Sequence, residues 1–166
     1  MKHFYVATSI AVLLLLALPA AAQSPTITEI PFSSFVVPAG PGACTFDVLF
    51  APEPGKPNGE RLIQFGNSSI IAGPLFLTLT NQSTGKSINL NASGPQVTSL
   101  SGGIPTTVRT LGTSLVLALP PNLAAAAGLP TVALTHGQVV STFDAQGTLS
   151  AVTFTGTAQD VCRMLE

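Results

Sequence analysis

The segment LFLTLTNQSTGKSINLNAS, residues 75–93, decides the fold class of this chain. Its second half, from Ser87 to Ser93, alternates apolar side chains with amide and hydroxyl side chains, and a period of two is typical of a half-buried strand. Its first half alternates leucine with threonine up to Thr80. Since the turn-forming residues 81–85 separate the two runs, the segment predicts a β-hairpin.

Similar short runs occur on both sides of this hairpin, separated by Gly, Pro, Asn and Asp. We expect strands near residues 45–50, 61–65, 108–119, 132–134, 139–143 and 149–155. The three prolines within residues 52–57 predict a loop, because proline cannot donate to a strand ladder. The sequence therefore predicts an all-β fold, an antiparallel β-sandwich or flattened barrel of about eight to nine strands, with a short C-terminal helix.

The apolar phase changes within residues 132–143. Val132 and Leu134 are out of phase with Val139 and Phe143 unless one residue is inserted between them. Glycine within a strand often marks a bulge. We therefore expect a β-bulge at Gly137.

Two short helical segments are expected. Residues 122–127 form one helical turn that Gly128 ends in the left-handed conformation. Thr157 and Asp160 match a capping box and begin a helix that runs to Leu165.

Charge is scarce along the whole chain. Its 166 residues include 6 Lys and Arg and 7 Asp and Glu, for a formal charge of −1, and only 8% of residues are charged, against about 25% in a typical soluble domain. This composition excludes a basic nucleic-acid surface and an acidic disordered tail. The hydrophobic content of 46% suits a folded core.

The first residues have the layout of a secretory signal peptide. Lys2 and His3 precede an apolar run from Tyr5 to Leu18, and small residues end the segment at Ala22. The alternative is an uncleaved anchor, but the run has about 14 residues where a membrane-spanning helix needs roughly 20. We expect residues 1–22 to be removed and residues 23–166 to form a single secreted β domain, with no membrane span after removal.

Two cysteines, Cys44 and Cys162, remain after that cleavage. In an exported chain an even number of cysteines predicts a disulfide, and two buried free thiols are the alternative. Two cysteines with one distant histidine do not match a zinc site, whose ligands come in closely spaced pairs. We expect a Cys44–Cys162 bridge that ties the two ends of the domain, and neither a metal nor a cofactor.

No catalytic constellation is apparent in the sequence. His136 is the only histidine after the expected cleavage, and a strand histidine of this kind is usually a surface or packing residue. A pair of carboxylates could perform acid–base hydrolysis, and the candidates are Asp47, Glu53, Glu60, Asp144 and Asp160. Each has a simpler role in a turn, loop, helix start or strand surface. The disulfide would bring Asp47, Asp160 and Arg163 together as a weak surface ion pair.

Three N-x-S/T sequons occur, at Asn67, Asn81 and Asn91. A chain rich in Asn, Ser and Thr produces such triplets by chance. The strand phase places Asn91 outward and Asn81 in a turn, so glycosylation in a eukaryotic host is sterically allowed.

Several turns and both cysteines carry a resemblance. The residues are Pro38-Ala39-Gly40, Ala43-Cys44-x-Phe46-Asp47, Leu79-Thr80-Asn81, Thr84-Gly85-Lys86-Ser87, Asn91-x-Ser93-Gly94-Pro95 and Gly156-x-x-x-Asp160-Val161-Cys162-x-x-Leu165. In these the chain resembles a loose group of small secreted bacterial all-β hypothetical proteins with one early and one late cysteine. The resemblance implies a secreted β domain with an end-to-end disulfide, and it implies no activity.

These observations favour a secreted, non-enzymatic binding or surface-associated β module whose partner is unknown, with self-association or a surface partner as options. One alternative is a small β-barrel carrier of an apolar ligand, with Leu119, Leu123 and Leu129 around its mouth. A second alternative is a carboxylate-dependent hydrolase.

Overall fold

The computed structural model describes residues 24–166, and the expected signal peptide, residues 1–22, lies outside them. Strands make up most of the described chain. The elements are β1 (Thr26–Ile30), β2 (Phe35–Val37), β3 (Val48–Pro52), β4 (Glu60–Phe65), β5 (Ser68–Ala72), β6 (Phe76–Asn81), β7 (Ser87–Asn91), β8 (Gln96–Ser101), β9 (Ile104–Val116), α1 (Pro121–Ala127), β10 (Ala133–Phe143), β11 (Leu149–Asp160) and α2 (Val161–Leu165).

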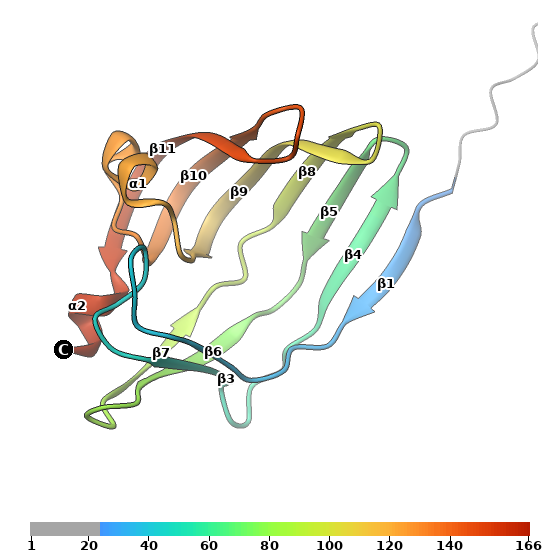
Figure 1. Ribbon diagram of the computed structural model, residues 1–166. Coiled ribbons are helices and arrows are strands. Elements are labelled where there is room, and N and C mark those ends of the chain that lie inside the picture. Colours follow the sequence, from blue (N-terminus) through green and yellow to red (C-terminus); the bar gives the residue numbers. More distant parts are fainter. Residues whose placement is uncertain (1–23) are drawn as a thin grey trace, which may run out of the picture.

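The strands form two antiparallel sheets (Figure 1). A seven-stranded sheet has the order β1-β4-β5-β8-β9-β10-β11, and a four-stranded sheet has the order β2-β3-β6-β7. The predicted all-β sandwich with a C-terminal helix is thereby confirmed, as is the predicted hairpin, which pairs β6 with β7. The described residues hold eleven strands, more than the eight or nine expected. The sequence did not indicate β1, β2, β5 and β8, because these strands are short and lack clear alternation in burial.

The chain passes repeatedly from one sheet to the other. Each of the four connections β1–β2, β3–β4, β5–β6 and β7–β8 joins a strand of one sheet to a strand of the other. In Figure 1, β5 runs on toward β6, and β7 toward β8, across the corner between the two sheets. Strands that change sheets in this way make the corners of β-sandwiches.

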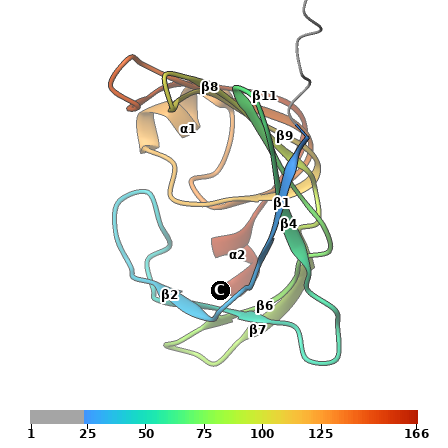
Figure 2. The same ribbon diagram turned by 90° about the vertical axis from the view of Figure 1, so that its right-hand side faces the viewer.

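Two apolar cores hold the layers together. The first contains Phe50, Leu79 and Leu90 of the four-stranded sheet together with Leu134 of β10 and Leu165 of α2. The second packs α1 against the inner face of β10 and β11. Figure 2 shows both helices on the inside of the curved seven-stranded sheet.

The first residues of β10 are buried on both faces, which explains the change of apolar phase. Leu134 belongs to the first core, whereas Ala133 and Val139 belong to the second. The expected bulge at Gly137 is wrong, because the ladders to β9 and β11 pass through Gly137 in register and shift only between Thr142 and Phe143. Consecutive residues at this end of β10 are apolar because the strand lies between the two cores there.

A row of glycines crosses the sheet where the three longest strands enter the space between the cores. Gly112, Gly137 and Gly156 are cross-strand partners. A Cβ atom on Gly137 would overlap the carbonyl oxygen of Thr155, and one on Gly156 would overlap that of His136. The close approach of β10 and β11 therefore requires glycine at this position on both strands.

The disulfide joins the segment before β3 to the C-terminal helix. Cys44 and Cys162 are bonded with a Cα–Cα distance of 5.2 Å, and Cys44 is buried. The predicted bridge is confirmed. Val161 and Leu165 of α2 are fully buried beside it, so the end of the chain is part of the first core.

Both predicted helices are present, but one begins at a different cap. Helix α1 ends at Gly128, whose φ of 66° is left-handed as expected. Helix α2 is capped by Asp160, whose side chain accepts a hydrogen bond from the backbone N–H of Arg163 at 3.2 Å. Thr157, the expected cap, lies within β11. The ladder with β10 extends to Asp160 and leaves the helix to start one residue later.

Candidate ligand-binding site

The seven-stranded sheet has an inner and an outer face, which β9 distinguishes most clearly. Thr110 and Ser114 point to the inner face, where α1 and the second core lie, whereas Arg109 and Leu111 are exposed on the outer face. The register continues the inner face across the sheet, since Thr110 is the partner of Gln96, and Gln96 that of Ile71.

A fork opens on the inner face where β8 separates from β9. The β8–β9 ladder begins at Gln96 and Thr110, and Gly94 donates its backbone N–H to the Thr113 carbonyl as the chain arrives from β7. A Cβ atom on Gly94 would overlap that carbonyl oxygen. β9 continues past this point to Val116, whereas the β7–β8 connection leads to the four-stranded sheet (Figure 1), which leaves a wedge between them.

This wedge holds a pocket of about 230 Å³, which we call the fork pocket. Its apolar wall is formed by Ile30, Ile71, Leu75, Ala92 and Leu115. Its polar groups come from Glu60, Gln96, Thr110 and Ser114, with Gly94 completing the lining. An apolar wall with a few polar groups is the usual composition of a small-molecule site.

The hydroxyl of Thr110 is buried without a hydrogen-bond partner, and it is the one side-chain atom of this kind within residues 24–166. Its neighbour Ser114 is satisfied, because its hydroxyl lies 2.9 Å from that of Thr135. Buried polar groups are almost always hydrogen-bonded, and leaving one unpaired costs about 1–3 kcal/mol. Thr110 is therefore the group in the pocket that most lacks a partner.

Glu60 is the one charged side chain that lines the fork pocket. It is partly buried at the start of β4, opposite Ile30 of β1. Burial raises the pKa of its carboxyl group above the ordinary value of 4.5, and no neighbouring charge contributes to this shift. Its sequence neighbour Arg61 lies on the outer face, where Glu29 is its cross-strand partner.

Glu60 also borders a second, larger hollow of about 450 Å³ at the edge of the sheet, between β1 and the β3–β4 loop. Asn58 forms part of its wall and is fixed by hydrogen bonds to the backbone N–H and carbonyl of Phe76. The two hollows share Ile30 and Glu60. Glu60 thus lies between the two hollows.

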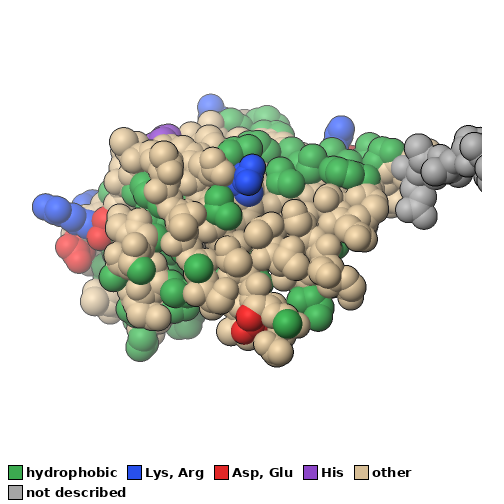
Figure 3. All heavy atoms as spheres, turned by 90° about the horizontal axis from the view of Figure 1, so that it is seen from above, with side chains coloured by type: hydrophobic (Ala, Val, Ile, Leu, Met, Phe, Trp, Pro, Cys, Tyr) green, Lys and Arg blue, Asp and Glu red, His purple; other side chains and the backbone are tan. Residues whose placement is uncertain are grey.

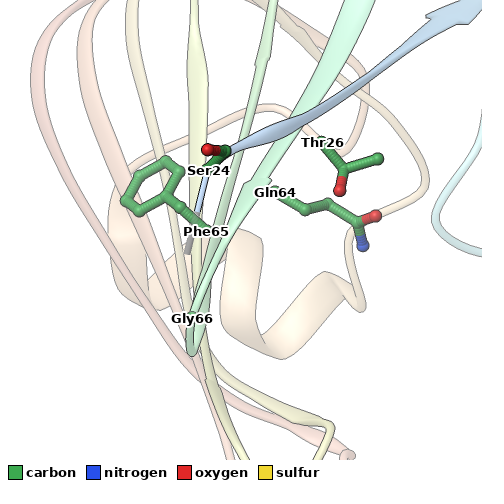
Figure 4. A pocket seen from close by; sticks show the side chains of 5 residues that line it. All are labelled: Ser24, Thr26, Gln64, Phe65 and Gly66. Atoms are coloured by element: carbon green, nitrogen blue, oxygen red, sulfur yellow. The ribbon is translucent and has the colours of Figure 1, made fainter. Parts of the chain in front are cut away.

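Another hollow of about 450 Å³ lies at the far end of β1 and β4. Figure 4 shows that its side chains do not converge, because the Phe65 ring points to one side of the sheet while Thr26 and Gln64 point to the other. The register agrees, since Thr26 and Gln64 are direct partners and Phe65 is the next residue. The hollow therefore extends around the edge of the sheet from one face to the other. Its lining contains no charged group.

The apolar residues expected around a carrier mouth do not lie at an opening. Leu119 and Leu129 are 5% and 6% exposed within the second core, and Leu123 packs against it. These leucines fill the space between α1 and the sheet. The prediction that these three leucines surround the mouth of a barrel is therefore wrong, because they pack between α1 and the sheet.

Glu60 is the only carboxylate candidate in the fork pocket. The others have local partners: Asp47 accepts from the N–H of Ala39 at 2.7 Å, Asp144 from two N–H groups of its turn, Asp160 caps α2, and Glu53 accepts from Asn89 at 3.3 Å. The expected ion pair among Asp47, Asp160 and Arg163 is wrong, because Asp47 and Asp160 accept hydrogen bonds from backbone N–H groups instead.

His136 is exposed on the outer face, where its Nδ1 atom lies 3.0 Å from the hydroxyl of Thr113. Within residues 24–166 no three His, Cys, Asp or Glu side chains are grouped so that they could hold a metal ion. None of the helices in that range is long and apolar enough to cross a membrane.

The three sequons differ in accessibility. Asn67 is exposed in the β4–β5 turn, and Asn91 is exposed at the end of β7. Asn81 is only 2% exposed, donates to the Leu165 carbonyl at 3.1 Å and accepts from two N–H groups of its own turn. The expected accessibility of Asn81 is wrong, because its side chain ties the hairpin to the C-terminal helix.

Sequence reasoning identified Glu60 as a candidate but missed Ile71, Gln96 and Thr110. These three lie on β5, β8 and β9, two of which were not predicted as strands. Thr110 falls within the predicted strand 108–119, but nothing in its neighbourhood signals a buried hydroxyl. Searches for related proteins found no matching family model, no similar curated protein and no similar solved structure.

Proposed function

We propose that this chain is an exported, non-enzymatic binding module that holds a small amphipathic ligand in the fork pocket. The observation that carries the proposal is the composition of the fork pocket, in which Ile30, Ile71, Leu75, Ala92 and Leu115 form an apolar wall beside a few polar residues. The ligand would hydrogen-bond to the Gln96 amide or the Glu60 carboxyl group. Its apolar part would cover the exposed surface of Ile71 and Leu115.

The size of the fork pocket limits the ligand. Its volume of about 230 Å³ corresponds to roughly eight water molecules at about 30 Å³ each, and hence to a ligand of about eight to ten non-hydrogen atoms. Each methylene group buried contributes about 0.8 kcal/mol. A ligand of this size should therefore bind with weak to moderate affinity.

Binding is favoured over catalysis because the fork pocket contains a single carboxyl group. General acid–base hydrolysis of the glycosidase type uses two carboxyl groups that flank the reacting bond. The fork pocket contributes one carboxyl group, from Glu60, together with an amide and two hydroxyl groups. This set can orient a ligand by hydrogen bonds and charge.

Export is supported by the disulfide, since such bonds persist in oxidising compartments, and by the signal-peptide layout of residues 1–22. Expression of the full chain in a secreting bacterium should yield protein outside the cytoplasm whose N-terminal residue is Gln23. Full-length protein retained with its first residue intact would contradict export.

The binding proposal can be tested by calorimetric titration with 1-octanol, a neutral probe that fits the fork pocket. Ile71→Trp fills the pocket, whereas Ile70→Trp places the same side chain on the outer face of the same strand. We expect one binding site in the wild type and in Ile70→Trp, and at least a tenfold loss of affinity in Ile71→Trp. No binding to the wild type, or equal binding by both variants, would contradict the proposal.

Self-association is a second candidate function, favoured by the outer face. Ile27, Ile63, Ile70 and Val97 are successive cross-strand partners and form an apolar row there. Ile27 is 60% exposed, and hydrophobic side chains form a band along the upper rim of the molecule in Figure 3. Exposed apolar patches of this kind often mark interaction sites.

The arrangement of charge favours a second copy of this chain as the partner of that row. β1 and β9 lie two strands to either side of β5. A two-fold axis through β5 would therefore place β1 of each copy over β9 of the other, with Glu29 near Arg109. Sedimentation equilibrium should give a dimer that Ile70→Glu dissociates and Ser68→Glu, at the margin of the same face, does not. A monomeric wild type would exclude this candidate.

A further inference from the structure

A hollow of about 230 Å³ lies on the outer face of the seven-stranded sheet, over β8 and β9, and we call it the outer hollow. Its lining consists of Val97, Ser99, Thr107, Arg109 and Leu111. The register places Val97 opposite Arg109 and Ser99 opposite Thr107, so these side chains share one face. The sheet therefore separates the outer hollow from the fork pocket, which lies on the inner face.

Arg109 is the one charged side chain among those that line the outer hollow. It is exposed, and its cross-strand partners are the uncharged residues Val97 and Val140. Arg61 lies on the same face of the sheet but differs from Arg109, because its cross-strand partner is Glu29. The guanidinium group of Arg109 is therefore accessible to an anion from solution and has no acidic cross-strand partner.

The apolar row leads from the outer hollow to the edge of the sheet. Val97 lines the hollow and is the partner of Ile70, and the row continues through Ile63 to Ile27. Ile27 is 60% exposed, and the other three side chains are partly exposed. A ligand whose charged end lies at Arg109 can therefore extend over a continuous apolar surface.

The apolar row is one residue wide. On one side of it, Ser68, Ser99 and Thr107 are successive cross-strand partners and carry hydroxyl groups. On the other side lies the charged pair Glu29 and Arg61. Attachment to a bilayer depends on a broad apolar area and on clustered basic residues. The narrow row with one unpaired arginine is better suited to a single free amphiphile.

We propose that the outer face binds a free fatty acid, with its carboxylate at Arg109 and its acyl chain along the apolar row. Arginine can hold a carboxylate by two parallel hydrogen bonds, and the hydroxyl groups of Ser99 and Thr107 are further donors in the outer hollow. The acyl chain covers apolar surface that otherwise contacts water. This inference goes beyond the ligand of the fork pocket and does not depend on it.

Binding of the fatty acid would regulate self-association, because the apolar row is also the interface of the dimer proposed above. In that dimer Glu29 of the second copy lies near Arg109. A bound fatty acid brings its own carboxylate to Arg109 and covers the row, so the fatty acid and the second copy exclude each other. In a monomeric protein the fatty acid binds without this competition.

The test is an NMR-monitored titration of the protein recovered from the secreting host with octanoate, 1-octanol and octylammonium. Octanoate should shift the methyl signals of Ile70 and Val97 and bind there at least fivefold more tightly than the other two probes. Arg109→Gln should reduce the affinity for octanoate to that for 1-octanol. The matched control Arg61→Gln removes an arginine that has an acidic partner on the same face, and it should keep the fivefold advantage.

The outcomes separate this inference from the binding function of the fork pocket. Octanoate that shifts only the signals of Ile71 and Leu115 would overturn the inference, as would an advantage of octanoate that persists in Arg109→Gln. If the wild type sediments as a dimer, saturating octanoate should convert it to a monomer, and a dimer that persists would show that the second copy alone occupies the row. None of these results changes the binding of 1-octanol in the fork pocket, which Ile71→Trp tests.

Discussion

Thr110 is the residue whose environment is least expected from its type. Threonine is common in strands because its branched side chain packs well on a pleated surface, but here its hydroxyl is buried with no partner. Such a group reduces stability in the empty protein. Departures of this kind from the usual rules of packing tend to occur near functional sites, and Thr110 lines the fork pocket.

Thr110→Val replaces the hydroxyl with a methyl group of similar shape. We expect the free energy of unfolding to rise by about 1 kcal/mol in the absence of ligand, because an unpaired buried polar group is removed. Urea denaturation measures this change. Thr107→Val on the outer face should stay within about 0.5 kcal/mol of the wild type, and a clear loss of stability in Thr110→Val would show that the hydroxyl is satisfied.

Glu60 gives the stability a definite pH dependence. Its pKa is raised in the folded state, so between the ordinary value of 4.5 and the raised value the folded state binds more protons than the unfolded chain. The free energy of unfolding should therefore fall as the pH rises through that interval, and the loss should be complete above the raised pKa. Urea denaturation from pH 4 to pH 8 should show this slope in the wild type and not in Glu60→Gln. A Glu60→Gln profile parallel to that of the wild type would contradict the assignment.

Single residues are also where prediction from the sequence is weakest. Asn81 follows an alternating run and begins a turn, which predicts exposure, yet it is buried against the Leu165 carbonyl. The contact joins residues 84 positions apart, and nothing local to Asn81 indicates it. Cys44 and Cys162 are the exception, because their number and the expected export indicated their pairing directly.

At the scale of elements, the glycine row sets the path of β9, β10 and β11. Gly137 and Gly156 approach so closely that neither has room for a Cβ atom. Beyond the row, β9 and β10 continue between the two cores, where Leu115 and Leu134 contact the first core and Val116 and Ala133 the second.

Gly137→Ala should destabilise the protein by about 3 kcal/mol or more, because the new methyl group overlaps the backbone of β11 and forces the strands apart. Thermal or urea denaturation measures the loss. Gly40→Ala is the matched control, since no atom lies within 4 Å of its Cβ position, and it should change stability by less than about 1 kcal/mol. Equal effects of the two substitutions would rule out the tight contact.

Elements with one buried face were predictable, and those with other environments were not. The β6–β7 hairpin alternates because its sheet covers the core on one side only, and the prediction there is confirmed. β10 is buried on both faces near Ala133, so its apolar phase suggested a bulge that does not exist. β5 is partly buried along its whole length and shows no alternation to detect.

At the scale of the whole molecule, the two sheets are joined by chain crossings and by one covalent bond. The disulfide spans 118 residues and fixes α2 against the first core. The fork pocket draws its lining from β1, β4, β5, β8, β9 and two connections. A site assembled from so many separate segments has no local pattern, which is why the sequence indicated only Glu60.

Removing the disulfide should cost most of the stability. A closed loop of this length is worth about 5 kcal/mol in the chain-entropy model. The double variant Cys44→Ala with Cys162→Ala should lose several kcal/mol in urea denaturation, and reductant should have the same effect on the wild type and none on the variant. A loss below about 1 kcal/mol would show that packing of α2 alone holds the end of the chain.

Intermolecular nuclear Overhauser effects show directly whether a small ligand occupies the fork pocket. In a complex with 1-octanol, the ligand methylene protons should show these effects to the methyl groups of Ile71 and Leu115. Effects confined to Ile70 and Val97 on the outer face, or none at saturating ligand, would show that the fork pocket does not bind this ligand.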